Sequence, residues 1–359
     1  MKSKVINLLK GIFIVCVFAI TLHIANTVLM HKSEDGYDQI QSYYKQIDNT
    51  VDVLFLGSSK IYCQIDTGLL WDEHGISSFD LGGAEAPPWN SYYFLKEALK
   101  TQKPKVIFYD ATIIGFRQDV LYQPEVWSMT NNYGMHWNIN RIKQIRENAQ
   151  TDDLFKKLLF PLDTMHSRYK ELTKNDFVDE NNTINYKGFD YRDGVREFER
   201  PDVSSMTESF VFDQKHEEYL RAMIQLSKEN NIPFIVMITP YVVKPEHQGY
   251  FNYVEDICNE EGITYIDFDK MYDEVGIDFS TDMAENIHLN FSGTRKLTEY
   301  LGNYIVDNFE VEDHRGDPIY SSWDIDAAIN RKNRLKAEDI DEYMQMYPEE
   351  FEEELSEEE

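Results

Sequence analysis

Two stretches far apart in the chain carry side chains whose types could act together on a substrate. Ser58 and Ser59 are adjacent near the start of the chain, and His288 lies in its last quarter. A serine hydroxyl is a poor nucleophile alone and needs a base that takes its proton. Glu285 stands three residues before His288 and Asp282 six residues before it. Either carboxylate could orient the imidazole through Nδ1 while Nε2 takes the serine proton. The spacing favours Glu285 as the acid, with Asp282 as the alternative.

Alternating strand and helix patterns predict the scaffold that positions these side chains. Short apolar runs bounded by turn residues occur at 51–56, 77–81, 105–110, 232–238 and 264–268. Segments of helical character follow or separate them, at 65–74, 88–99, 213–229, 250–261 and from 293 to about 308. This alternation predicts an α/β fold with a parallel sheet and helices on both faces. Ligands of such sheets bind beyond the carboxyl ends of the strands, where Ser58 and Ser59 follow the first run.

The sheet pattern is interrupted between residues 113 and 210. About a hundred residues are too many for an ordinary loop, so we expect a mainly helical insertion that caps the edge of the sheet where the serines lie. Its aromatic residues include Trp127, Tyr133, His136 and Trp137. They could stack on sugar rings, or they could form the insertion's own small core, which we favour. His166 and Arg168, in the same insertion, are expected to be structural.

The N-terminal segment predicts a membrane anchor. Gly11–Met30 is mostly apolar and has no formal charge, and Lys2, Lys4 and Lys10 precede it. About 20 such residues suffice to cross a bilayer, and positive charge on the leading side keeps that end in the cytoplasm. A cleaved signal peptide and a buried helix are the alternatives. We therefore expect a cytoplasmic start and anchor over residues 1–32, a polar linker over 33–50, and an α/β domain over 51–312 outside the membrane.

Charge and cysteine content exclude several classes of function. The formal net charge of −29 argues against a basic nucleic-acid surface. Residues 313–359 form an extension, in which residues around Trp323 are expected to fold back over the domain and the acidic end to be a solvated tail. The three cysteines show no metal-ligand spacing, so we expect no disulfide, metal site or cofactor.

Together, the serine and histidine blocks resemble the SGNH or GDSL-type hydrolases. In that family a first strand ends in Gly-Asp-Ser, which here reads Gly57-Ser58-Ser59. The family's last block is Asp-x-x-His, read here as Glu285-Asn286-Ile287-His288 and followed by Leu289, Asn290 and Gly293. The resemblance covers about 52–307 without the insertion and implies a flavodoxin-like three-layer α/β/α domain.

The resemblance also implies roles for individual residues. Ser59 would be the nucleophile, His288 the base and Glu285 the acid, with Gly82 and Gly83 as the nearest candidates for the oxyanion hole. The Gly-x-Asn of the family's third block has no counterpart, because the third apolar run continues into Asp110-Ala111-Thr112.

The Gly-Ser-Ser form is similar to the membrane-anchored branch that acts on cell-surface polymers, which includes polysaccharide O-acetyltransferases and the lipoteichoic acid D-alanylation protein. This likeness implies an esterase or O-acyltransferase outside the membrane, with an acylated carbohydrate or other ester as substrate. A membrane-bound acyltransferase is a further partner that it implies.

Two alternatives to this interpretation remain open at the level of sequence. Ser58 and Ser59 could have a purely structural role as a helix N-cap. Gly82 and Gly83 could likewise have no role other than to form the turn between strand and helix. The missing third-block asparagine also suits a catalytically weak accessory or polymer-binding subunit of an envelope acylation system.

Overall fold

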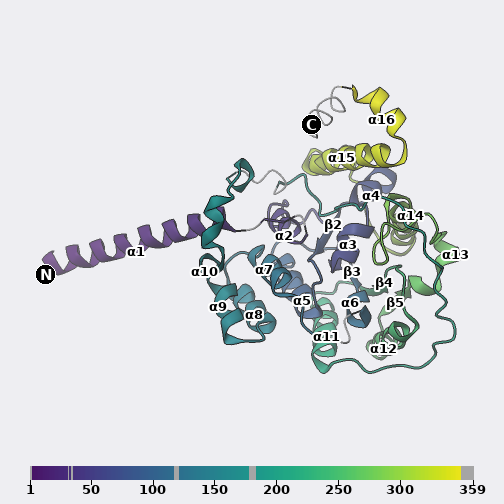
Figure 1. Cartoon of the computed structure of the whole chain (residues 1–359), viewed down its shortest axis with the longest axis horizontal. Helices are drawn as coiled ribbons and strands as arrows, with labels where there is room; N and C mark the ends of the chain where they lie inside the picture. Colours follow the sequence, from purple (N-terminus) through teal and green to yellow (C-terminus); the bar gives the residue numbers. More distant parts are fainter. Residues whose placement is uncertain (1, 31, 34, 117–120, 178–182, 349–359) are drawn as a thin grey trace.

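The computed structural model describes the chain except residues 1, 31, 34, 117–120, 178–182 and 349–359 (Figure 1). Its centre is a sheet of five parallel strands, β1 (Val53–Gly57), β2 (Ser78–Gly82), β3 (Val106–Asp110), β4 (Phe234–Ile238) and β5 (Thr264–Asp267). The strands lie in the order β2-β1-β3-β4-β5. All five coincide with the apolar runs of the sequence, so the predicted α/β fold with a parallel sheet is confirmed.

Alternate side chains of β1, β3 and β4 enter two different hydrophobic clusters. In β1, Leu54 and Leu56 belong to one cluster, and Val53 and Phe55 belong to the other. Because successive strand residues point to opposite faces, two apolar faces need two covers. The first cluster includes side chains from α5 (Pro88–Ala98), α11 (Gln214–Glu229) and α12 (Pro245–Glu261). The second includes side chains from α3 (Ser59–Gln64), α4 (Thr67–His74) and α14 (Phe291–Asn308).

The helix expected over 65–74 begins two residues later and is preceded by a short helix that the sequence did not predict. Asp66 ends the link between α3 and α4 and caps α4, because its side chain accepts a hydrogen bond from the backbone N–H of Leu69. Two short helical segments follow β5, namely η3 (Phe268–Lys270) and α13 (Tyr272–Val275).

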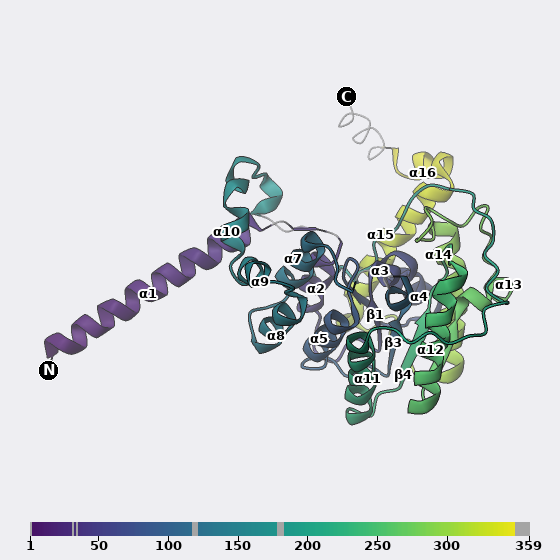
Figure 2. The same ribbon diagram turned by 60° about the horizontal axis from the view of Figure 1, so that its bottom comes forward.

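The insertion is helical only in its first part, which contains α6 (Thr112–Phe116), α7 (Glu125–Tyr133), α8 (Ile139–Asn148), α9 (Asp152–Leu159), α10 (Pro161–Met165), η1 (His166–Lys170) and η2 (Lys174–Asp176). Its last part, residues 183–210, has neither helix nor strand, so the expectation of a mainly helical insertion is met only in part. Helices α7 to α10 lie between the sheet and α1 in both ribbon views (Figures 1 and 2). Asn131 of α7 donates to the carbonyl of Ala84, which follows β2, so α7 reaches the carboxyl end of that strand. Tyr133 is buried in the insertion's own cluster, and His136 stacks on Tyr44. For these two residues, the packing role is the one observed.

Helix α1 (Lys2–Leu29) projects away from the domain (Figure 1). Its apolar part, Lys4–Leu29, is long enough to cross a membrane and is unburied over its most apolar window. The expected linker over 33–50 is wrong in part, since it contains α2 (Tyr37–Tyr43), whose Tyr37, Ile40 and Tyr43 are buried. This helix packs on β2 and α7.

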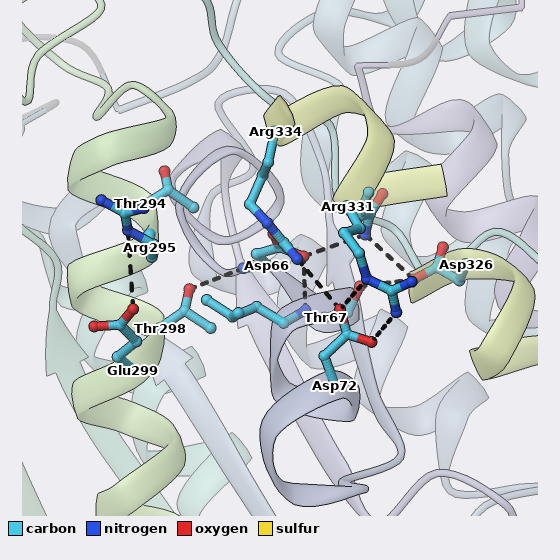
Figure 3. Close-up of polar contacts among 12 residues, drawn as sticks. Asp66, Thr67, Asp72, Thr294, Arg295, Thr298, Glu299, Asp326, Arg331 and Arg334 are labelled. Carbon is cyan, nitrogen blue, oxygen red and sulfur yellow. Dashed lines mark hydrogen bonds and ion pairs between the residues drawn. The ribbon is translucent and has the colours of Figure 1, made fainter. Parts of the chain in front are cut away.

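The C-terminal extension folds back as expected, through η4 (Pro318–Tyr320), α15 (Ser321–Glu338) and α16 (Ile340–Met346). Trp323 is buried and donates its indole N–H to the carbonyl of Ser78 in β2. Figure 3 shows a second set of contacts, in which Arg334 of α15 pairs with the buried carboxylate of Asp66. The end of the acidic tail lies outside the described residues.

Candidate active site

Ser59 lies where the sheet offers a site. The chain runs from β1 to the edge strand β2 and then returns past β1 to β3, so the strand order reverses between β1 and β3. Such a reversal opens a crevice at the carboxyl ends of the strands. Ser58 caps α3, since its hydroxyl accepts from the Lys60 N–H at 3.4 Å, and Ser59 is the first residue of that helix.

The loop that carries His288 is held by its own hydrogen bonds. Met283 and Leu289 form an isolated antiparallel bridge, and the backbone N–H of Ala284 donates to the carbonyl of His288 at 3.1 Å. Asn290 caps α14 and donates its amide N–H to the carbonyls of Gly194 and Thr281. The imidazole is therefore presented from a closed turn.

Close packing at the start of α14 explains the glycine that follows the histidine block. A Cβ on Gly293 would lie 2.5 Å from the carbonyl oxygen of Asp282. Only a residue without a side chain lets α14 begin this close to the loop.

The structure brings Ser59, His288 and Glu285 into one hydrogen-bonded relay. His288 Nε2 lies 2.8 Å from Ser59 Oγ, and His288 Nδ1 lies 2.6 Å from Glu285 Oε1. An ionised carboxylate only accepts, so Nδ1 carries the proton and Nε2 is free to accept from the serine hydroxyl. This is the geometry that general-base activation of a serine requires.

The charges around the relay keep the base in its neutral form. Burial is the main cause that lowers the pKa of His288 below its usual value; the hydrogen bond from Nδ1 to Glu285 raises it, and the Lys60 ammonium lowers it. The same hydrogen bond lowers the pKa of Glu285, with help from Arg192 and Arg196. At neutral pH the pair is therefore a carboxylate and an uncharged imidazole, which is the state that can take a proton.

Asp282, the alternative acid, does not contact His288. Its side chain is fully buried and accepts hydrogen bonds from the N–H of Asp278, the hydroxyl of Ser292 and the ammonium of Lys296. These contacts tie the start of the loop to α14. The structure therefore places Glu285, and not Asp282, on the imidazole.

The two candidate oxyanion glycines serve close packing. The N–H of Gly83 donates to the carbonyl of Gly57 at 3.3 Å, which extends the β1–β2 ladder. A Cβ on Gly82 would lie 2.9 Å from the Ser58 carbonyl, and one on Gly83 would lie 2.4 Å from Asn131 Oδ1. Gly83 therefore does not supply the expected donor.

Asp110 stands where the third-block asparagine is missing, and it has a structural partner. The carboxylate is buried and accepts from the N–H and hydroxyl of Thr239 at 3.0 and 2.8 Å and from the hydroxyl of Thr112 at 2.9 Å. Burial raises its pKa, while Lys60 and these donors lower it. Asp110 thus joins the ends of β3 and β4 beneath the site.

Lys60 is the site residue that sequence reasoning missed. Only 5% of its surface is exposed, and its ammonium donates to the carbonyls of Pro240, at 2.9 Å, and Ile287. The ammonium also lies 4.8 Å from the centre of the Tyr241 ring. Burial lowers its pKa to about 8. A lysine followed directly by the apolar Ile61-Tyr62-Cys63 was the available signal.

A small pocket opens beside the relay. Its volume is about 100 Å³. The lining includes Ser59 and His288, together with Glu85, Ile113, Phe116, Tyr241, Ile287 and three further residues, Ser58, Lys60 and Thr112. A buried water molecule needs about 10–15 Å³ of such space, so the pocket has room for a small acyl group. The insertion contributes to this pocket only through its first residues.

Glu285→Gln is expected to slow ester turnover by up to about 10⁴-fold, because an amide no longer fixes the protonated Nδ1 tautomer or stabilises the imidazolium. The lost hydrogen bond also raised the pKa of His288, so the acidic limb of kcat/KM should move to lower pH. A pH–rate profile of both proteins measures the two effects. Asp282→Asn is the comparison. If Glu285→Gln lost no more rate than Asp282→Asn and its acidic limb did not move, Glu285 would not be the acid of the relay.

Lys60→Met is expected to move the acidic limb of the same profile to higher pH, because the ammonium lowers the pKa of His288. The carbonyls of Pro240 and Ile287 also each lose one of two side-chain donors, and one hydrogen bond contributes about 0.5–1.5 kcal/mol to the free energy of unfolding. Gln64→Leu is a matched control, since Gln64 donates to the same two carbonyls at 3.3 and 3.2 Å but carries no charge. An identical shift in both variants would show that the charge of Lys60 is not the cause.

Neither the models of known families nor the curated proteins gave a match to the chain. Within the described part of the chain, no three His, Cys, Asp or Glu side chains are grouped so that they could hold a metal ion.

Proposed function

We propose that this protein is an SGNH-like serine esterase or O-acyltransferase that acts outside the membrane. The observation that carries the proposal is the continuous contact from Ser59 Oγ through His288 to Glu285, at 2.8 and 2.6 Å. In the sequence, Ser59 lies near the start of the α/β domain, and Glu285 and His288 lie near its end. The parallel sheet with apolar clusters on its two faces suits the three-layer α/β/α arrangement of that superfamily.

The reaction follows from the relay. Ser59 Oγ attacks the ester carbonyl carbon and passes its proton to His288 Nε2, while Glu285 stabilises the imidazolium. The tetrahedral intermediate collapses, the C–O bond of the ester breaks, and the leaving alkoxide takes the proton from Nε2. Water or a sugar hydroxyl then attacks the acyl-serine and gives its proton to Nε2. The bond between the acyl carbon and Ser59 Oγ breaks, Oγ takes the proton back from Nε2, and the acid or the new ester is released.

The negative oxygen of the intermediate needs donors. We assign one of them to the backbone N–H of Ser59, because the first N–H groups of a helix have no partner within it. Ser59 is the first residue of α3. One such donor is typically worth about 3 kcal/mol in the barrier.

The pocket and the N-terminal helix restrict the substrate. A space of about 100 Å³ next to Ser59 and His288 fits an acetyl group or one of similar size. Helix α1 is long and apolar enough to anchor the chain, and Lys2, Lys4 and Lys10 favour a cytoplasmic N-terminus. The resemblance to the membrane-anchored branch of the SGNH hydrolases then suggests an O-acylated polysaccharide of the cell envelope, or one in export, as the substrate.

Turnover of a series of p-nitrophenyl esters by the full chain in detergent tests this proposal. We expect kcat/KM for the acetate to exceed that for the octanoate by about tenfold or more, because each poorly accommodated methylene costs specificity. Release of acetate from an O-acetylated polysaccharide should depend on Ser59. Folded protein that turns over no ester would favour the accessory, polymer-binding role instead.

A further inference from the structure

The insertion has an exposed surface next to the C-terminal end of α1. The segment 160–177 contains the junction between α9 and α10, the short helices η1 and η2, and three strongly exposed aromatic side chains. Phe160 is 57% exposed, Tyr169 62% and Phe177 66%. Tyr is enriched at membrane–water interfaces, and Phe is common on the apolar face of segments that lie in the interface.

This segment is fixed to the end of the apolar helix by polar contacts. Arg168 donates to the carbonyl of Met30 at 2.9 Å and pairs with Asp176. Lys32 in turn donates to the carbonyl of Asp176 at 2.9 Å. In both ribbon views α10 lies against the base of α1 (Figures 1 and 2). The segment therefore keeps a set position relative to α1.

The segment also lies beside residues of α1 that precede the end of the helix, and this fixes how deep the segment can lie in a membrane. A hollow of about 490 Å³ between the two elements is lined by Leu22, Asn26, Phe160, Leu162 and His166. Leu22 precedes the last residue of α1 by seven residues, or about 10 Å along a helix. The part of α1 without formal charge, from Gly11 to Leu29, measures about 28 Å, close to the thickness of a hydrocarbon core of about 30 Å, so the end of α1 lies at the membrane surface.

The charge of the segment also suits a lipid surface. The chain as a whole has a formal net charge of −29, but residues 152–177, which are α9 and the segment, contain equal numbers of basic and acidic residues. Their five basic residues are Lys156, Lys157, Arg168, Lys170 and Lys174, and their five acidic residues are Asp152, Asp153, Asp163, Glu171 and Asp176. This part of an otherwise acidic protein is therefore not repelled by lipid headgroups.

We infer that segment 160–177 is a membrane-seated collar, in which Phe160, Tyr169 and Phe177 insert into the headgroup layer around the exit point of α1. This inference rests on the proposed membrane anchoring by α1. The collar holds the insertion on the bilayer, and the insertion separates the bilayer from the sheet, so Ser59 faces material beyond the lipid surface. The occupant of the collar's aromatic face is lipid, and polymer substrates are expected at the Ser59 pocket.

Nitroxide depth measurements on the full chain in phosphatidylcholine–phosphatidylglycerol nanodiscs test the collar. Single labels are placed by Phe160→Cys and Phe177→Cys in a Cys16→Ser background, in which the buried Cys63 and Cys258 remain. Ile14→Cys, 66% exposed on α1, reports whether the helix is inserted. Val306→Cys and Ile319→Cys, 48% and 52% exposed, are the aqueous references.

The expected result is a graded one. The label at residue 14 should collide with oxygen far more than with a nickel chelate, and labels at 160 and 177 should show severalfold higher oxygen-to-nickel ratios than labels at 306 and 319. Aqueous ratios at 160 and 177 with a buried label at 14 overturn the collar and leave the anchor intact. An aqueous ratio at residue 14 overturns both.

Discussion

His288→Ala is expected to reduce kcat for ester turnover by about 10⁴–10⁶-fold, because removal of one member of a serine relay removes most of the catalysis that the whole relay supplies. Without Nε2 at 2.8 Å from Ser59 Oγ, the hydroxyl keeps its proton and remains a weak nucleophile. The p-nitrophenyl acetate assay measures this loss. Circular dichroism of the variant controls for unfolding.

The double variant Ser59→Ala/His288→Ala distinguishes a relay from two independent contributions. Residues that act as one unit give non-additive losses, so the double variant should be about as slow as either single variant. Multiplication of the two losses, or a His288→Ala protein within tenfold of wild type, would contradict the proposed role of the imidazole.

Arg334→Met is expected to lower the free energy of unfolding by about 3–5 kcal/mol, because removal of one partner of a buried ion pair leaves the other charge uncompensated. Asp66 is 1% exposed and Arg334 is 9% exposed. The contact joins α15 to the start of α4, and the Asp66 N–H also meets the Thr298 hydroxyl of α14 at 3.0 Å (Figure 3). Urea unfolding of the full chain in detergent, followed by tryptophan fluorescence, measures the change.

Arg331→Met is the matched control for this prediction. Arg331 lies on the same helix and pairs with Asp72 at 2.6 Å, but its side chain is 63% exposed. Exposed ion pairs contribute about 0–1 kcal/mol, so this variant should unfold almost as wild type does. Addition of Asp66→Asn to Arg334→Met should restore part of the lost stability. Equal losses in the two single arginine variants would contradict the distinction between buried and exposed pairs.

Strands β1, β3 and β4 were predictable because each is a short apolar run with both faces buried. Val53, Leu54, Phe55 and Leu56 are all 0% exposed, so the sequence shows an uninterrupted apolar segment that ends at Gly57. The seryl and histidyl blocks were predictable for a related reason, since each directly adjoins a regular element that fixes its position.

Other features depend on partners that a linear pattern does not reveal. Helix α2 was read as a linker because its seven residues include polar ones, yet Gln39 and Ser42 are fully buried in contact with the rest of the fold. Spacing favoured Glu285 over Asp282, but only the fold shows that the Asp282 carboxylate accepts hydrogen bonds from Lys296 and Ser292 instead. The buried position of Lys60 depends on the carbonyls of Pro240 and Ile287, which converge on its ammonium from a distant part of the sequence.

Labelling of the full-length protein with a fluorophosphonate probe is the most direct test of the central claim. A serine activated by His288 attacks the phosphorus and becomes covalently modified, and tandem mass spectrometry locates the adduct. The prediction is a stoichiometric adduct on Ser59 Oγ that disappears in Ser59→Ala and forms much more slowly in His288→Ala. An unlabelled, folded wild-type protein, or labelling that persists in Ser59→Ala, would contradict a nucleophilic role for Ser59.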